Sequence, residues 1–263
     1  MRTAIVIPAR HASSRYPGKP LVDLRGPDGT KSLIRRSWEA ASAVGDHEVA
    51  VATDDARIRD HCEAFGARVL MTSEDARNGT ERCAEAAGML DADLIVNLQG
   101  DAPLTPPWFV TALIEAMREG DADVATPVLR CDVQAYRRLR ADRAAGRVGG
   151  TTAAVGARGQ GLYFSKEVIP FLAREVDHRD VFHHVGLYAY TPAALARYAA
   201  LPQGVLERHE GLEQLRFLEH GLTVACVEVE ARGRVFWELN NPEDVPRIEA
   251  ALAGAASAEG DAP

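Results

Sequence analysis

The chain has 263 residues, a length that suits one large α/β domain or one domain with an insertion. It carries 30 lysine and arginine residues against 38 aspartate and glutamate residues, a net charge of −8. This acidic balance argues against a general nucleic-acid binder, so any attraction for an anionic ligand must be local. No apolar run reaches transmembrane length and none of the four cysteines forms a CxxC pair, so we expect a cytoplasmic protein with reduced, buried thiols.

The first 120 residues alternate between short apolar runs and helical patterns. The runs are apolar throughout, which is typical of strands covered on both faces. The alternation predicts a doubly wound, mainly parallel sheet flanked by helices. The predicted strands cover 3–7, 48–55, 67–72 and 93–101, and the predicted helices cover 31–44, 56–66, 78–90 and 106–120.

The rhythm changes after residue 120. Short predicted strands surround an arginine-rich span at 137–147 and a Gly/Thr/Ala stretch at 148–160. We expect the region 125–220 to be an insertion that closes a pocket or builds a subunit contact. The chain is otherwise expected to form one domain over 1–252, with a disordered tail over 253–263. The later strands are predicted at 122–130, 161–165, 183–192 and 223–230, with a helix at 212–221.

The loop after the first predicted strand carries a dense set of cations. Arg10, Arg15 and Lys19 fall within ten residues, with Ser13 among them and prolines that stiffen the loop. Cations, hydroxyls and backbone N–H groups suit the closely spaced oxygens of a triphosphate. The loop matches neither the P-loop pattern nor the dinucleotide fingerprint GxGxxG. A solvated surface turn is the alternative, although three cations at a parallel strand's exit repel one another unless an anion binds.

Two further segments suit a nucleotide site. Asp101 leaves a buried strand into a proline-bounded turn, where a carboxylate can bind Mg²⁺ or simply cap the turn. Gln99 lies two residues earlier and can reach the same pocket. In RNGTER (77–82), Gly79, Thr80 and backbone donors can read a base edge, and a plain helix N-cap explains the same residues equally well.

Polar side chains also stand among apolar neighbours in FHHVGLYAY and ERHEGLEQLR. His184, Tyr188, Glu213 and Gln214 offer the donors and acceptors that a polyhydroxylated or acidic substrate needs. A helix would place Glu213 and Arg216 on one face, where a simple ion pair is possible. Each residue taken alone also has a structural explanation, since a single histidine is ordinary in a core.

These motifs together resemble one known family. IPARHASSRYPGKPL, VATDD, MTSEDARNGTER, VNLQGDAPL, LYFSKEVIP, HHVGLYAY, LEQLR and NNPEDV occur in the order and spacing of the CMP-Kdo synthetases, the 3-deoxy-manno-octulosonate cytidylyltransferases. The resemblance implies a Rossmann-like nucleotidyltransferase fold with a small antiparallel insertion, usually assembled as a homodimer. It also implies that CMP passes from CTP to a small acidic acceptor, with Mg²⁺ as cofactor and release of pyrophosphate.

The resemblance assigns roles to residues already singled out for their chemistry. Lys19 and Arg10 resemble the triphosphate binders and, with Asp101, form the expected catalytic group. Ser13 and Arg15 belong to the same nucleotide-binding loop, and Gly79 and Thr80 fall in the cytosine-recognition segment. Asp101 and Asn240 match the two metal positions. The positions that contact the family's sugar acid correspond to Gln99, His184, Tyr188, Glu213 and Gln214.

Two departures from the family concern the metal and the acceptor. The family normally has aspartate where this chain has Asn240, whose neutral oxygen gives a hard cation a weaker field. The stretch 147–160 replaces the family's own segment near the acceptor. The sequence predicts CMP transfer to Kdo or a similar sugar acid, with transfer to a phosphonate such as phosphonoformate as the alternative. A nucleotide-binding homologue without catalysis is a third reading, supported only by Asn240.

Overall fold

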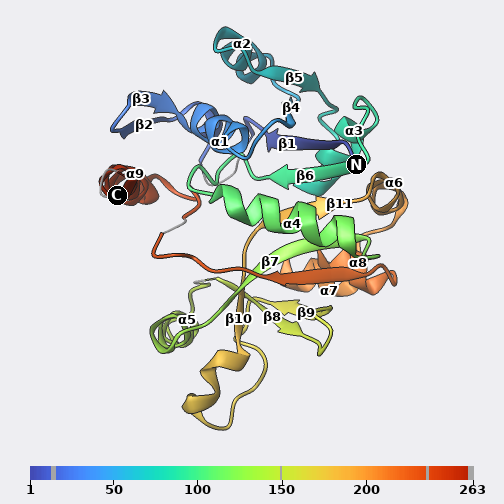
Figure 1. Ribbon diagram of the computed structural model, residues 1–263, viewed down its shortest axis with the longest axis vertical. Coiled ribbons are helices and arrows are strands. Elements are labelled where there is room, and N and C mark those ends of the chain that lie inside the picture. Colours follow the sequence, from blue (N-terminus) through green and yellow to red (C-terminus); the bar gives the residue numbers. More distant parts are fainter. Residues whose placement is uncertain (13–15, 149, 235–236, 260–263) are drawn as a thin grey trace. The chain divides into compact units, whose positions relative to one another are not determined.

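A computed structural model describes residues 1–12, 16–148, 150–234 and 237–259 (Figure 1). The chain divides into two compact units, one formed by 1–111 with 232–263 and the other by 112–231. The second unit contains the region 125–220 for which the sequence predicts an insertion, and the single domain over 1–252 stays a prediction. Within the described residues, no helix is both long and apolar enough to cross a membrane.

The first unit is built on four parallel strands in the order β5-β4-β1-β6. The chain runs outward from β1 to β4 and β5 and then returns to the other side of β1, so the strand order reverses between β1 and β6. Ligands of such sheets bind outside the carboxyl ends at this reversal. The strands are β1 (Thr3–Ala9), β4 (Glu48–Thr53), β5 (Arg68–Met71) and β6 (Leu94–Leu98).

Helices pack on these strands, and polar caps fix where the helices begin. Ser32, Asp55 and Asn78 each accept a hydrogen bond from a backbone N–H of the following turn, at 3.3, 2.9 and 2.8 Å. The four parallel strands and the helices packed on them confirm the α/β class and the helix-flanked parallel sheet, both predicted from the sequence. The helices are α1 (Leu33–Ser42), α2 (Ala56–Ala64) and α3 (Gly79–Ala87).

A second small core joins the two ends of the chain within the first unit. Leu24, Leu33, Leu239 and Ile248 are fully buried together. Figure 1 shows α9 beside the β2–β3 hairpin. The two strands of this hairpin were not predicted from the sequence. The sequence predicted a disordered tail from residue 253, but α9 extends as far as Glu259. Residues 260–263 lie outside the described residues. The elements of this part are η1 (Lys19–Leu21), β2 (Asp23–Gly26), β3 (Gly29–Ser32), η3 (Pro242–Asp244) and α9 (Val245–Glu259).

The second unit is mainly antiparallel, as predicted for the insertion. β7 pairs with β10 and β11 in antiparallel fashion and with β12 in parallel, while β8 lies between β10 and β9. Its strands are β7 (Val124–Arg130), β8 (Thr151–Val155), β9 (Gly161–Ser165), β10 (Phe182–His184), β11 (Leu187–Tyr190) and β12 (Val224–Glu228). Its helices are α5 (Val133–Ala144), η2 (Glu175–Asp180), α6 (Pro192–Ala200), α7 (Val205–Glu210) and α8 (Leu215–Glu219), and α4 (Pro107–Glu119) contains the division at residue 111.

The arginine-rich span is mostly the helix α5, whose cations pair locally. Arg137 bonds Glu175 at 2.6 Å and Arg143 bonds Glu167 at 2.5 Å. Residues 148–160, which the sequence analysis left without a strand, contain β8 and the turn into β9. All four cysteines are buried thiols, as expected.

Arg216 pairs with Glu207, a partner that the sequence did not predict, and the possible ion pair with Glu213 stays a prediction. The predicted helix at 212–221 begins only at Leu215, and Arg216 forms a bidentate pair with Glu207 of α7, with both N–O distances at 2.7 Å. The two side chains are 1% and 3% exposed. The Tyr198 ring also covers the guanidinium, at 4.1 Å.

We predict that Arg216→Met destabilises the protein by about 3–5 kcal/mol, because it leaves the Glu207 carboxylate buried without its counter-charge. Urea unfolding measures the loss. Arg137→Met removes the same charge from the exposed pair with Glu175 and should leave the unfolding midpoint unchanged. Equal losses in the two variants would contradict this interpretation.

Candidate nucleotide site and acceptor residues

An ion pair links the first loop to the turn after β6. Nζ of Lys19 lies 2.6 Å from Oδ2 of Asp101, and both side chains are partly buried. Arg10 is exposed directly after β1. The structure thus brings together Lys19 and Asp101, which the sequence placed on two separate strand exits, at the reversal of strand order. Ser13 and Arg15 lie outside the described residues.

Two glycines let these loops approach closely. A side chain at Gly100 would place its Cβ 2.7 Å from the carbonyl oxygen of Pro8, so only glycine fits there without displacing the backbone. Gly18 has a φ of 71° and donates its N–H to the carbonyl of His11 at 3.0 Å, which closes the first loop just before Lys19.

Asn240 lies next to the same turn. The backbone N–H of Leu239 donates to the carbonyl of Asp101 at 2.9 Å, so the two predicted metal positions occupy neighbouring stretches of backbone. Among the described residues, no group of three or more His, Cys, Asp or Glu side chains could hold a metal ion.

RNGTER forms the start of α3. Asn78 is the N-cap, so the interpretation of this motif as a cap is confirmed. Gly79 lies beside the amides of Gln99 and Asn97, since a Cβ there would be 3.4 and 3.5 Å from them. Thr80 is fully buried, and Arg77 pairs with Glu81 at 2.6 Å across the first turn. Gln99 therefore lies against the segment proposed to read the base.

Arg82 forms buried contacts that were not predicted from the sequence. It is 3% exposed, and its guanidinium lies 3.4 Å from Oδ2 of Asp54 and bonds the hydroxyl of Thr72. Arg82 therefore ties α3 to the segments that follow β4 and β5. Both halves of the contact stand in the quoted motifs VATDD and NGTER, but nothing in either motif says that they pair.

Of the five residues predicted to contact the acceptor, four lie in the second unit, and Gln99 lies in the first. Tyr188 donates its hydroxyl to Oε1 of Gln214 at 3.1 Å. Nε2 of Gln214 is buried and has no hydrogen-bond partner in the described part of the chain. A buried donor of this kind is costly unless an acceptor reaches it. Glu213 is half-buried directly before Gln214.

His184 is held as a neutral ring. Its Nε2 lies 2.9 Å from the hydroxyl of Thr126, which itself donates to the carbonyl of Leu187 at 2.9 Å. Because the hydroxyl has one hydrogen, His184 acts as the donor in their contact. Burial lowers the pKa of His184 to about 3, with a smaller contribution from His183. The ring packs against Phe164 and Tyr188, at 4.9 and 5.6 Å between centroids.

A parallel sheet whose strand order reverses is typical of nucleotide-binding α/β proteins, which bind their ligands outside the carboxyl ends of the strands. Residues 4–229 match a family model described as cytidylyltransferase. The 3-deoxy-manno-octulosonate cytidylyltransferase of Maricaulis maris is 42% identical over 257 residues, covering 96% of this chain and 98% of that one. The 8-amino-3,8-dideoxy-manno-octulosonate cytidylyltransferase of Shewanella pealeana is 39% identical, covering 96% and 99%.

A solved structure agrees. CMP:2-keto-3-deoxy-manno-octonic acid synthetase complexed with CTP matches with a TM-score of 0.84 and 34% identity, over 97% of this chain and 100% of that chain. The chain therefore belongs to the cytidylyltransferase family, and its resemblance to the CMP-Kdo synthetases is confirmed.

We predict that His184 makes the protein sensitive to acid. The unfolded chain binds a proton at this residue near pH 6.5 and the folded chain only near pH 3, so stability falls as the pH drops through this interval. The slope should grow as the pH falls below 6.5 and approach about 1.4 kcal/mol per pH unit between about pH 5.5 and 4. In His184→Gln, which keeps an N–H for Thr126 but does not titrate, urea unfolding should show a slope smaller by about one proton. The exposed His209→Gln is the matched control, and an unchanged slope in His184→Gln would contradict the prediction.

Proposed function

We propose that the protein transfers CMP from CTP to Kdo or a closely related sugar acid and releases pyrophosphate. The observation that carries the proposal is the Lys19–Asp101 pair at the β1/β6 reversal, in a chain whose relatives bear cytidylyltransferase names. A transfer of this kind needs positioning and neutralisation of charge more than a covalent nucleophile. The resemblance also leads us to infer a cytoplasmic homodimer.

Lys19 and Arg10 would bind the triphosphate. Without nucleotide, the charge of Lys19 is satisfied by Asp101 at 2.6 Å. A triphosphate offers Lys19 several anionic oxygens, so binding of CTP would draw the ammonium away and release the carboxylate of Asp101. Gly79 and Thr80, at the start of α3 beside Gln99, would contact the base.

Asp101 and Asn240 would hold Mg²⁺. The released carboxylate of Asp101 and the amide oxygen of Asn240 fit the oxygen ligands that the ion prefers. When bound, Mg²⁺ would neutralise phosphate charge and polarise the attacking oxygen. Because Lys19 occupies Asp101 in the ligand-free protein, Asp101 becomes available for the ion together with nucleotide.

The second unit would bind the acceptor. Nε2 of Gln214 is a buried donor that needs an acceptor atom, and a carboxylate or hydroxyl of a sugar acid supplies one. The bond from Tyr188 fixes the Gln214 amide so that its nitrogen, rather than its oxygen, is left for the ligand. His184 remains neutral and would act as a fixed hydrogen-bonding group rather than as a base.

A pyrophosphate-release assay with CTP, Mg²⁺ and separate acceptors tests the activity and its acceptor. We expect turnover with Kdo or 8-amino-Kdo, and much less with phosphonoformate. Turnover on the phosphonate alone would assign the acceptor to the other class. CTP binding without turnover on any acid would favour a homologue that lacks catalysis.

Lys19→Ala tests the triphosphate role. Loss of one charge-stabilising donor should lower kcat/KM for CTP about 100- to 1,000-fold, with the fold retained by circular dichroism. Lys31→Ala is the matched control, because Lys31 of β3 pairs with Asp28 and Glu39 outside the proposed site. Near-normal turnover of Lys19→Ala would rule out the role given to this lysine.

A further inference from the structure

The carboxylate of Asp244 is occupied by N–H donors of its own segment. Its Oδ2 accepts from the backbone N–H groups of Asn240 and Asn241 at 2.9 and 2.7 Å, and its Oδ1 accepts from the indole Nε1 of Trp237 at 3.0 Å. Hydrogen bonds to an ionised acceptor are among the stronger ones in proteins. Asp244 therefore closes a loop of backbone around Asn240.

The residue on the other side of Asn240 is fixed as well. Leu239 is fully buried against Leu24, Leu33 and Ile248, and its N–H donates to the carbonyl of Asp101 at 2.9 Å. Asn240 thus stands between an apolar anchor at 239 and a polar anchor at 244. Leu239 fixes the peptide that precedes it, and Asp244 fixes the two peptides on either side of Asn240.

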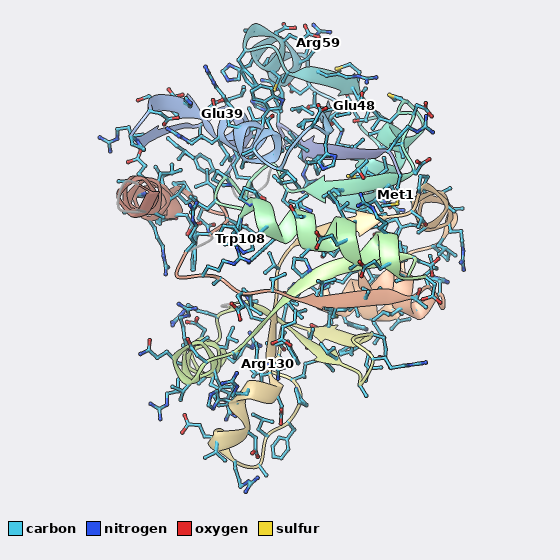
Figure 2. All side chains as sticks on the ribbon, in the orientation of Figure 1. Met1, Glu39, Glu48, Arg59, Trp108 and Arg130 are labelled. Carbon is cyan, nitrogen blue, oxygen red and sulfur yellow. The ribbon has the colours of Figure 1, made fainter. Side chains whose placement is uncertain are left out.

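Aromatic contacts brace the same segment further upstream. The guanidinium of Arg247 lies 3.6 Å from the centre of the Trp237 ring, and those of Arg232 and Arg234 lie 5.0 and 5.6 Å from that of Trp108. Trp108, labelled in Figure 2, lies at the start of α4. The cation–π contact with Arg247 helps to hold the Trp237 ring in the position from which it donates to Asp244.

We propose that Asp244 is a positioning residue for metal binding: it fixes Asn240 beside Asp101 and does not itself ligate the ion. The proposal rests on the proposed function. Its physical reason is the neutrality of Asn240. An amide oxygen attracts a hard cation more weakly than a carboxylate does, so its contribution depends on being held in place. Groups that orient a metal ligand without touching the metal typically change metal affinity about 10- to 100-fold.

Calorimetric titration of CTP, without acceptor and with or without Mg²⁺, tests this assignment on the full chain without turnover. In the wild type, Mg²⁺ should tighten CTP binding. Asp244→Asn replaces one acceptor oxygen with an amide group that faces the donors. It should raise the Mg²⁺ concentration that gives half of the gain in CTP affinity by about 10-fold or more. The affinity for CTP without metal should stay unchanged. Glu243→Gln is the matched control, because it removes the same charge from the exposed neighbouring residue.

A double-mutant cycle separates positioning from ligation. If Asp244 acts through Asn240, then adding Asp244→Asn to Asn240→Ala should cause little further loss. Trp237→Phe removes the indole donor, keeps an aromatic ring beside Arg247 and should reproduce part of the effect, which keeps the test valid if Asp244→Asn folds poorly.

Unchanged metal dependence in a folded Asp244→Asn variant, or additive losses in the cycle, would overturn the assignment and leave the proposed function standing. A wild-type protein whose CTP affinity does not respond to Mg²⁺ would overturn both.

Discussion

Gly100 packs against the carbonyl of Pro8, and the spacing of the proposed site depends on that contact. Pro8 is near the end of β1 and Gly100 follows β6, so the glycine sets how closely the two loops approach. Lys19 and Asp101 extend from these loops and meet at 2.6 Å. The hydroxyl of Ser37 on α1 donates to the carbonyl of Gly100 at 3.0 Å and holds the turn in that position. A larger residue at 100 would separate the charges before it affected any ligand.

Both units bury charged groups and pair them internally, as in the Arg82–Asp54 contact of the first unit and the Arg216–Glu207 pair of the second. The first unit also has the partly buried Lys19–Asp101 pair at the edge of its sheet. The second unit satisfies His184 through Thr126, whereas Nε2 of Gln214 has no hydrogen-bond partner among the described residues. Rings from Phe164 through His184, Tyr188, Tyr190 and Phe217 to Tyr198 follow one another at 4.6–5.7 Å between centroids. Such a packed row leaves little room for rearrangement and gives Gln214 a rigid setting.

The sequence predicted the parallel sheet well, because uniformly apolar runs such as AIVI at 4–7 leave little ambiguity and the helices carry clear caps. It did not predict the β2–β3 hairpin, whose short strands contain polar residues and no alternation. The arginine-rich α5 lacks a clear apolar face, so its helix was missed. In the site, residue types pointed to Lys19 and Asp101, but their pairing depends on β1 and β6 being parallel neighbours in the sheet. The partners of Arg216, Arg82 and Asp244 were likewise beyond the sequence, because side-chain choice among several acids is decided by tertiary packing.

The small core of Leu24, Leu33, Leu239 and Ile248 combines residues that are more than 200 positions apart in the chain. A ribosome makes Leu24 and Leu33 early and delivers Leu239 only after the whole second unit has emerged. Until then this core lacks Leu239 and Ile248, and the carbonyl of Asp101 lacks its bond from the N–H of Leu239. The loops proposed to bind nucleotide are thus synthesised first, and the segment that carries Asn240, a proposed metal position, is synthesised later. A nascent chain that ends before residue 232 would therefore have an incomplete proposed site, because the first unit needs residues from both sides of the second unit.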